Sequence, residues 1–385
     1  MSDRRIPLSV PNLKGNELKY VTEAVETEWV STGGPFVNQF EKHVAEYVHA
    51  RGAVSCQSGT AGLHTALLLA EVSHEDAVIV PTLTFIAAVN PVRYIGACPI
   101  FMDCDDSLCM DPVKLEKYCE TQCDFIDGRL TDKKTGRHVK ALVVVHVFGN
   151  MADMEAICEI ARRFRLILIE DATEALGTCY TEGANQGKFA GTLGDIGVYS
   201  FNGNKIITTG GGGMLVSDNT SYLERARHLT TQAKSDELYY CHDEIGYNYR
   251  MTNLQAALGL AQLEQLEEFI SIKADNYKCY QHYISELPGM RLLPFREGVR
   301  SNYWFYALYI DGTVMNRDEW IHFLAGHGVQ TRPIWGLIHE QKPYKDSYTY
   351  EIVKAKNYWK HVVNIPCSTN LTAEDIERVA GLLRG

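Results

Sequence analysis

The chain alternates between short apolar runs and longer stretches in which apolar residues recur at helical spacing. Residues 151–165 show the helical type, because Met154, Ile157, Ile160 and Phe164 fall on one face. The apolar runs are continuous, which is typical of strands buried on both faces of a sheet. They are residues 77–82, 98–105, 141–148, 166–171, 196–201 and 212–218. This alternation predicts an α/β fold with an open, mostly parallel sheet and helices on both sides.

The same pattern predicts two domains. A large domain would comprise residues 1–250, with an N-terminal arm at 1–15. Residues 252–287 have helical character and contain no proline, which predicts one long connecting helix into a smaller αβ domain at 251–385. The polar segment 119–139 predicts an insertion at the rim of the sheet.

Composition and charge exclude several classes of protein. The net charge of −11, with no basic cluster, argues against binding to nucleic acid or to a membrane surface. Pro7 and Pro11 would interrupt a signal peptide, and no apolar run is long enough to cross a bilayer. Eleven cysteines in a large chain without a signal predict reduced thiols and a cytoplasmic protein. Cys119 and Cys123 lack a second ligand pair at zinc spacing, so we expect no metal site.

In an open α/β sheet, ligands bind beyond the carboxyl ends of the strands. Ser58, Gly59, Thr60 and Ala61 open an apolar helix, and the free backbone N–H groups of such a helix start suit a phosphate. The signal is weak by itself, because a serine there is usually only an N-cap. Phe85 follows another predicted strand, where an aromatic residue is more often part of the core.

Charged residues mark three further strand ends. His146 lies inside an apolar run, where a histidine is usually structural. Glu170 and Asp171 end the next strand, and a buried carboxylate there needs a positive partner. Ser200 ends the strand at 196–201, and Lys205 follows it. Four consecutive glycines come directly after the "KIITT" that Lys205 begins, and such freedom of the backbone is expected where the chain closely approaches another group.

Together these strand ends supply what pyridoxal 5′-phosphate (PLP) requires. Its phosphate suits a helix start and its ring a stacking aromatic side chain, its ring nitrogen a carboxylate, and its aldehyde a lysine. Each feature has an ordinary structural explanation, but their joint occurrence in this order favours a cofactor site.

Motifs along nearly the whole chain resemble the DegT/DnrJ/EryC1/StrS family of fold-type I PLP-dependent sugar aminotransferases. The resemblance implies a large mixed, mostly parallel sheet domain and a smaller C-terminal αβ domain. The matching motifs, in order, are "GNELKYVTEAVETEWVSTGGPFVNQFE" (15–41), "SGTAGLHTALL" (58–68), "PTLTFIAAVNPV" (81–92), "VHVFGN" (145–150), "IEDATEALG" (169–177), "GVYSFNGNKIITTGGGGML" (197–215), "GYNYRMTNLQAALGLAQL" (246–263) and "TRPIWGLIH" (331–339).

The resemblance also implies roles for individual residues. Lys205 would form the Schiff base and move a proton, Asp171 would pair with the pyridine nitrogen, and Phe85 would stack on the ring. Glu174 would lie near the phenolic oxygen of the cofactor, where many members carry glutamine. The phosphate contacts would come from Ser58, Gly59, Thr60, Ala61 and Ser200, with Asn248 reaching in from the other subunit of a homodimer. The substrate contacts would come from Arg250, Arg332, Trp335 and His339.

Two departures from the family pattern bear on the substrate. Gly211 stands where many members have glutamate, and the insertion at 119–139 is absent from many relatives. Both, with "NGNKIITT", resemble the branch of the bacillosamine and legionaminic acid pathways. This branch would transfer an amino group from L-glutamate to the C4 ketone of UDP-2-acetamido-2,6-dideoxy-hexos-4-ulose. A C3 aminotransferase for a UDP-3-keto sugar is the first alternative, and a 4-aminotransferase for GDP-4-keto-6-deoxymannose is the second.

Three other functions are disfavoured. A sugar dehydratase of this fold would carry histidine in place of Lys205. A non-catalytic regulator would not need both Lys205 and Asp171, because a buried ionic site is costly. A phosphate-binding NTPase would need G-x-x-x-x-G-K-[ST], whereas here the glycines follow the lysine.

Overall fold

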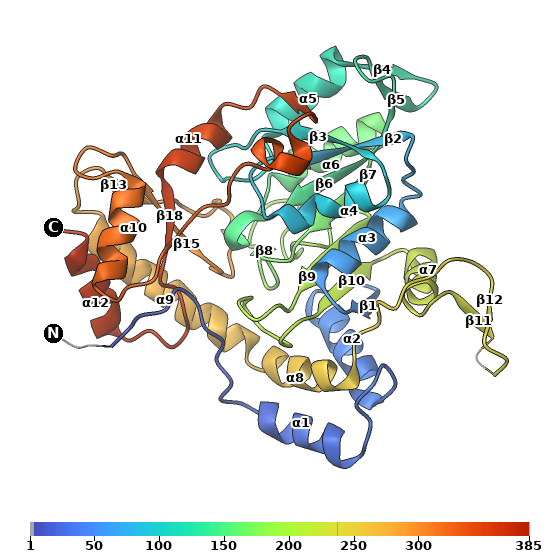
Figure 1. Ribbon diagram of the computed structural model, residues 1–385, viewed down its shortest axis with the longest axis horizontal. Helices are drawn as coiled ribbons and strands as arrows, with labels where there is room; N and C mark the ends of the chain where they lie inside the picture. The colour runs from blue at the N-terminus through green and yellow to red at the C-terminus, as the bar shows by residue number, and fades with distance from the viewer. Residues whose placement is uncertain (1–3, 237, 385) are drawn as a thin grey trace.

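The computed structural model describes residues 4–236 and 238–384, and a ten-stranded mixed sheet forms its centre (Figure 1). Along the main path β10 is antiparallel to both of its neighbours, and all strands from β9 to β17 run parallel. The main path runs β1 (Gly52–Cys56), β10 (Gly213–Ser217), β9 (Ile196–Ser200), β7 (Ile167–Asp171), β6 (His138–Val145), β2 (Asp76–Pro81), β3 (Cys98–Met102) and β17 (Tyr348–Tyr350). All six predicted strands are confirmed, and each is buried along most of its length, as continuous apolar runs require.

Two groups of helices pack with the sheet. Helix α3 (Gly59–Leu69) contacts β1, β7, β9 and β10, and it also packs on α4 (Asn90–Tyr94) and α7 (Thr220–Thr230). Helix α6 (Met154–Phe164) contacts β7 and α5 (Pro112–Thr121). The apolar face predicted for residues 151–165 is the buried face of α6, so the helical period correctly identified its core side.

A second, four-stranded antiparallel sheet forms from the C-terminal part of the chain. Its order is β13 (Met290–Leu292), β15 (Tyr306–Ile310), β18 (Val362–Ile365) and β16 (Arg332–Pro333), with helices α10 (Arg317–Gly326), α11 (Lys354–His361) and α12 (Ala373–Leu382) around it. The N-terminal arm lies here too, because Ile6 forms a parallel bridge with Val329. Residues early in the sequence therefore stabilise the last part of the fold.

The predicted connecting stretch at 252–287 is helical as expected, but it forms two helices and not one. Helix α8 (Asn253–Leu263) packs on α1 (Glu17–Glu26) and α2 (Pro35–Tyr47), whereas α9 (Leu266–Ile284) packs on α12 and β13. At the break, Glu264 accepts hydrogen bonds from Tyr20 and Asn16, and the Gln265 amide donates to Glu17. The two helices have different packing partners, and Glu264 and Gln265 separate them.

The polar segment 119–139 forms a β-hairpin at the rim of the large sheet. Strands β4 (Cys123–Ile126) and β5 (Arg129–Asp132) pair with each other, and Thr131 pairs with His138 at the start of β6. Asp127 and Gly128 both have positive φ angles of 52° and 77°, as the tight turn of a two-residue hairpin requires. The segment therefore lies at the rim of the sheet as expected, and its being an insertion relative to other family members stays a prediction. Shorter pairs are β8 (Cys179–Tyr180) with β14 (Val299–Arg300), and β11 (Lys234–Asp236) with β12 (Cys241–His242).

Within residues 4–236 and 238–384, none of the helices has the length and apolar character needed to cross a membrane. All eleven cysteines belong to the described part of the chain and are free thiols, as predicted.

Candidate active site

A cavity of about 370 Å³ lies at the carboxyl ends of β7 and β9, where the sequence predicted a ligand site. Nine of the predicted site residues line it: Ser58, Gly59, Thr60, Phe85, Asp171, Glu174, Ser200, Lys205 and Trp335. The chain brings them together because the ends of neighbouring parallel strands meet at one edge of the sheet.

Lys205 projects into this cavity from the turn that follows β9. Its backbone N–H donates to the Asn202 carbonyl at 3.0 Å, and its side chain is only 12% exposed. The Nζ atom lies 3.9 Å from Oε1 of Glu174 and 4.0 Å from the ring centroid of Trp304. Burial lowers the pKa of this amine, whereas the nearby carboxylates of Glu174 and Asp171 act to raise it. Burial therefore makes the neutral, basic form of this amine easier to reach than in an exposed lysine.

The two adjacent acidic residues at the end of β7 have different environments. Glu170 is fully satisfied, because its carboxylate accepts from the backbone N–H groups of Gly191, Leu193 and Gly194 and lies 2.9 Å from Nε2 of His146. The Nδ1 atom of His146 accepts from the Ala152 N–H, so Nε2 carries the proton that His146 donates to Glu170. The expected structural role of this histidine is therefore confirmed.

Asp171 has far fewer partners. It is 3% exposed, and the backbone N–H of Thr173 donates to its Oδ1 at 3.1 Å. Burial raises the pKa of its carboxyl group, against the opposing effects of Thr173, Lys205 and His146. A buried carboxylate with a single backbone donor is suited to accept a proton-bearing group from a ligand.

Glu174 is held in the turn after β7 with 3% of its surface exposed. Its Oε2 atom accepts from the Phe148 N–H at 2.7 Å, and its other oxygen faces Lys205. Burial raises the pKa of this carboxyl group, and the charge of Lys205 and the Phe148 N–H oppose that rise. Phe148 has φ +58°, a left-handed conformation that is strained in a non-glycine residue, and strain of this kind is common at functional sites.

The start of α3 forms the opposite wall of the cavity. Ser58 is the N-cap, and its Oγ accepts from the Ala61 N–H at 3.0 Å. Gly59 and Thr60 line the cavity, whereas Ala61 is not among the lining residues. A Cβ atom on Gly59 would lie 2.9 Å from Cγ2 of Thr173, so glycine is required for this close approach. The Gly59 and Thr60 N–H groups at a helix start form a cradle for an anion.

The glycines after Lys205 allow a tight turn of the backbone and a close approach of β10 to the start of α3. Gly210 has φ +77°, which only glycine adopts readily, and Gly211 and Gly212 line the cavity. A Cβ atom on Gly213 would lie 2.5 Å from the Ser58 carbonyl. The glycines therefore let β10 pass directly behind the helix start that forms the cradle.

Two aromatic residues predicted for the site lie at its walls. Phe85 is 54% exposed, so its ring is free to contact a ligand. Trp335 packs on Phe148 at 4.7 Å between ring centroids.

Four other predicted residues lie outside the lining of this cavity. Arg250 is buried and forms an ion pair with Glu41, and Asn248 is exposed. Arg332 is exposed and donates to the Thr331 carbonyl.

The fourth residue is His339, whose Nδ1 atom lies 2.6 Å from the hydroxyl oxygen of Thr82. Burial lowers the pKa of its imidazole. The contact of Asn248 with a cofactor phosphate, and the contacts of Arg250, Arg332 and His339 with a substrate, stay predictions.

The residues of the cavity fit PLP. A buried lysine, a carboxylate with one backbone donor, and free N–H groups at a helix start match the aldehyde, ring nitrogen and phosphate of that cofactor. The crowding at Gly59 and Gly213 is explained by the same arrangement, because the cradle must stay open to an anion.

Sequence reasoning did not identify several lining residues: Thr84, Thr173, Asn202, Asn204, Trp304 and Phe305. Thr84 and Thr173 adjoin predicted strand ends, so that position could have suggested them. Trp304 and Phe305 come from the segment before β15, in the second sheet, and no local pattern places them here.

Comparison with known proteins places this geometry in context. The model of the DegT/DnrJ/EryC1/StrS aminotransferase family matches residues 11–384. The GDP-perosamine synthase of Escherichia coli O157:H7 is 38% identical over 371 residues, which cover 96% of this chain and 95% of that protein. The putative pyridoxal phosphate-dependent aminotransferase EpsN of Bacillus subtilis is 36% identical over 385 residues, covering 99% and 95%. The aminotransferase TlmJ of Streptoalloteichus hindustanus superposes with a TM-score of 0.88 at 29% identity, covering 99% and 98%.

Proposed function

Because this chain belongs to the DegT/DnrJ/EryC1/StrS aminotransferase family, we propose that it transfers an amino group from L-glutamate to the C4 ketone of a nucleotide-linked 6-deoxyhexose. The chain is a fold-type I, PLP-dependent sugar aminotransferase. The observation that carries the proposal is the placement of Lys205, Asp171 and Glu174 in one cavity opposite the helix start at Gly59.

Each wall of the cavity has a role in holding the cofactor. The N–H groups of Gly59 and Thr60 and the Ser200 hydroxyl would bind the phosphate. Asp171 would accept the hydrogen bond of the protonated ring nitrogen, and the exposed ring of Phe85 would cover the pyridine. When bound, PLP supplies the electron sink that allows an amino group to be exchanged for a keto oxygen.

Lys205 moves protons in both half-reactions. Its amine removes a proton from the α-carbon of L-glutamate in the first half-reaction and delivers a proton to C4 of the sugar in the second. Burial favours the neutral amine, which is the form that acts as a base. The Glu174 carboxyl group lies 3.9 Å away, and its ionised form favours the protonated amine against the effect of burial. The site thus balances the two forms that the lysine must adopt in turn.

For the nucleotide of the acceptor we give first place to GDP. The sequence predicted a UDP-linked N-acetyl sugar, but the relatives from Escherichia coli and Caulobacter vibrioides carry the name GDP-perosamine synthase. Their names support GDP-4-keto-6-deoxymannose as the acceptor. The UDP-linked sugar is the second candidate, supported by the "NGNKIITTGGGGM" motif and the rim hairpin of residues 119–139.

We also propose that the active site is shared between two subunits of a homodimer. Asn248 is exposed and does not line the cavity of its own chain. The family resemblance nevertheless implies that Asn248 contacts the cofactor phosphate. The two flanking tyrosines, Tyr247 and Tyr249, stack on each other at 5.0 Å and pack on His64 of α3. These ring contacts hold the segment against α3 and leave Asn248 exposed, which suits its delivery to the phosphate in the partner subunit.

The experiment that tests the proposed reaction supplies L-glutamate with each keto sugar in turn. The 4-keto sugars are generated in situ from GDP-mannose and from UDP-N-acetylglucosamine, and NMR locates the new C–N bond. We expect an amine at C4 of the GDP sugar, with the UDP sugar converted at least tenfold more slowly. An amine at C3 would contradict the proposal, and exclusive turnover of the UDP sugar would reverse the order of the two candidates.

A further inference from the structure

Trp304 lies directly against the side chain of Lys205. The Nζ atom of Lys205 is 4.0 Å from the centroid of the indole ring, which is within the range of a cation–π interaction. The indole N–H donates to the carbonyl oxygen of Asn204 at 2.7 Å, and Asn204 immediately precedes the lysine. One side chain therefore contacts both the amine and the backbone that carries it.

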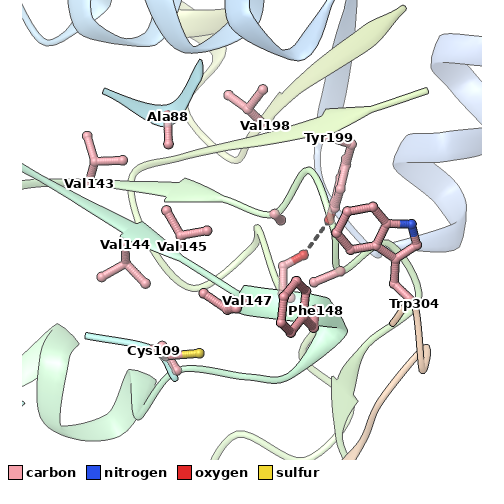
Figure 2. Packing of buried hydrophobic residues seen from close by; sticks show 14 of the residues in the cluster. Ala88, Cys109, Val143, Val144, Val145, Val147, Phe148, Val198, Tyr199 and Trp304 are labelled. Atoms are coloured by element: carbon pink, nitrogen blue, oxygen red, sulfur yellow. Dashed lines mark hydrogen bonds between the residues drawn. The ribbon is translucent and has the colours of Figure 1, made fainter. Parts of the chain in front are cut away.

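Trp304 is itself held firmly. It is 3% exposed, and its ring stacks on Phe305 with 4.1 Å between centroids and 16° between planes. Figure 2 shows the indole beside Phe148, past the end of β6. The backbone N–H of Trp304 donates to Oδ1 of Asn302. The side-chain amide of Asn302 in turn donates to the backbone carbonyl of Glu174. The same small network therefore fixes the groups on two sides of the lysine amine.

The backbone turn before Trp304 is strained and is anchored by hydrogen bonds. Tyr303 has φ +53°, a left-handed conformation that is costly for an aromatic residue. The strain is tolerated because Asn302 and Ser301 anchor the turn: the Asn302 N–H bonds Thr178, and the Ser301 hydroxyl bonds the Gly149 carbonyl.

We propose that Trp304 is a positioning residue for Lys205: its indole face supports the positively charged side-chain nitrogen, and its N–H fixes the adjoining backbone. The proposal rests on the proposed function only in taking Lys205 as the residue that binds PLP. It assigns a positioning role to a residue of the segment that leads into β15, so this segment meets the large domain at the reacting amine.

Other charged groups face the same amine. Glu174 and Asp171 approach it from the end of β7 and the turn that follows. Lys273 of α9 lines a small cavity of about 20 Å³ that Lys205 and Trp304 also line. Because these groups are not altered when Trp304 is changed chemically, a shift in the protonation of the lysine nitrogen can be assigned to the ring itself.

The sharpest test changes the electronic character of the ring and leaves its shape nearly intact. The wild-type PLP-bound enzyme is prepared with tryptophan, 5-fluorotryptophan or a trifluorinated tryptophan, and the visible absorption of the cofactor is titrated against pH. Fluorine withdraws electron density from the ring face and so weakens its attraction for a cation. The chain has five tryptophans, so the W304F enzyme, labelled in the same way, is the matched control.

We expect the midpoint of the wild-type titration to fall with each added fluorine, by about 0.5 to 1 pH unit for the trifluorinated protein. The W304F enzyme should show no dependence on fluorination. A W304L enzyme should lose at least tenfold in kcat with KM changed less than threefold, and W304F should recover part of that loss. Trp335→Phe, which alters a second indole of the cavity, should leave the midpoint in place.

A fluorinated wild-type enzyme with an unshifted midpoint would overturn the proposal, as would equal shifts in the W304F enzyme. Because fluorination leaves the fold intact, this result holds even where W304L fails to fold. Absence of PLP binding by the wild-type enzyme would instead contradict the proposed function, so the two failures are distinguishable.

Discussion

The side-chain nitrogen of Lys205 lies 3.9 Å from Oε1 of Glu174, and these side chains are only 12% and 2% exposed. Burial alone would favour the neutral amine and the neutral acid. Their attraction favours the charged pair, because the Coulomb energy of two charges is large in a poorly solvated site. The pair therefore sets the pH at which the lysine nitrogen gains its proton.

Replacing Glu174 by glutamine should lower that pH. The amide has nearly the shape of the carboxyl group but no charge, so the protonated form of the Lys205 nitrogen loses its nearest anion. We expect the visible absorption of the PLP-bound E174Q enzyme to titrate about one pH unit lower than that of the wild type. Glutamine can still accept the hydrogen bond of the Phe148 N–H, so kcat should fall less than tenfold. An unchanged midpoint would contradict the electrostatic role of Glu174.

The adjacent residues Glu170 and Asp171 should respond oppositely to neutralisation. Glu170→Gln removes a charged acceptor from three backbone N–H groups and His146, which should lower the free energy of unfolding by about 2–4 kcal/mol. Asp171→Asn removes a buried charge with one backbone donor and should leave the cofactor-free protein equally stable or up to about 1 kcal/mol more stable. Denaturant unfolding measures both.

The pH dependence of that stability has a definite sign. Burial raises the pKa of Asp171 in the folded chain above its value of 3.8 in the unfolded chain, so the folded state binds the proton more tightly. The stabilisation from this proton is complete below the unfolded pKa and is lost as pH rises through the folded pKa. The cofactor-free wild type should show this pH-dependent contribution, and cofactor-free D171N should not. Transamination should nevertheless fall by at least a hundredfold in D171N, and near-normal turnover would contradict the role of Asp171.

We expect Arg250 to contribute to the stability of the fold, whereas the sequence suggested a contact with the substrate. Its guanidinium forms a buried ion pair with Glu41, whose carboxylate also accepts from the N–H and hydroxyl of Ser55. Arg250→Met should lower the free energy of unfolding by about 3 kcal/mol, because a buried carboxylate loses its partner. Arg227 also pairs with Glu41, but its side chain is half-exposed. Arg227→Met should therefore lower the free energy of unfolding by less than about 1 kcal/mol. A stable R250M enzyme with a raised KM would favour the substrate contact that the sequence suggested.

The strand ends explain how much of the site was predictable. Lys205, Asp171 and Ser200 each follow an apolar run, and parallel strands bring such positions together regardless of their separation in sequence. The helix start at Ser58 was visible in the same way, because small residues precede an apolar helix. Residue type and order were therefore sufficient for the centre of the cavity.

The remaining contacts depend on packing between distant segments. Trp304 reaches Lys205 from the segment before β15, and nothing in its surroundings in the sequence distinguishes it from a core tryptophan. Arg250 meets Glu41 across 209 residues, so its partner could not be read from a local pattern. The break after α8 was missed for the same reason, because each half of the helical stretch is periodic and only its packing partners differ.

A shared active site should be detectable by subunit exchange. Lys205→Ala and Asn248→Ala enzymes are each expected to lose most activity, the second through weaker phosphate binding by the partner subunit. Mixing them should restore about a quarter of wild-type activity, because half of the dimers become heterodimers in which one of two sites keeps both residues. Verified exchange without any recovery would contradict the shared site.

The most direct test of the whole account is the position at which PLP becomes attached. The holoenzyme is reduced with borohydride, digested, and mapped by mass spectrometry, with K205A treated in parallel. We predict one phosphopyridoxyl group per chain, on Lys205, and no specific attachment in K205A. Attachment at another lysine, such as the buried Lys273 that shares the small cavity behind Trp304, would contradict the assignment of the active site.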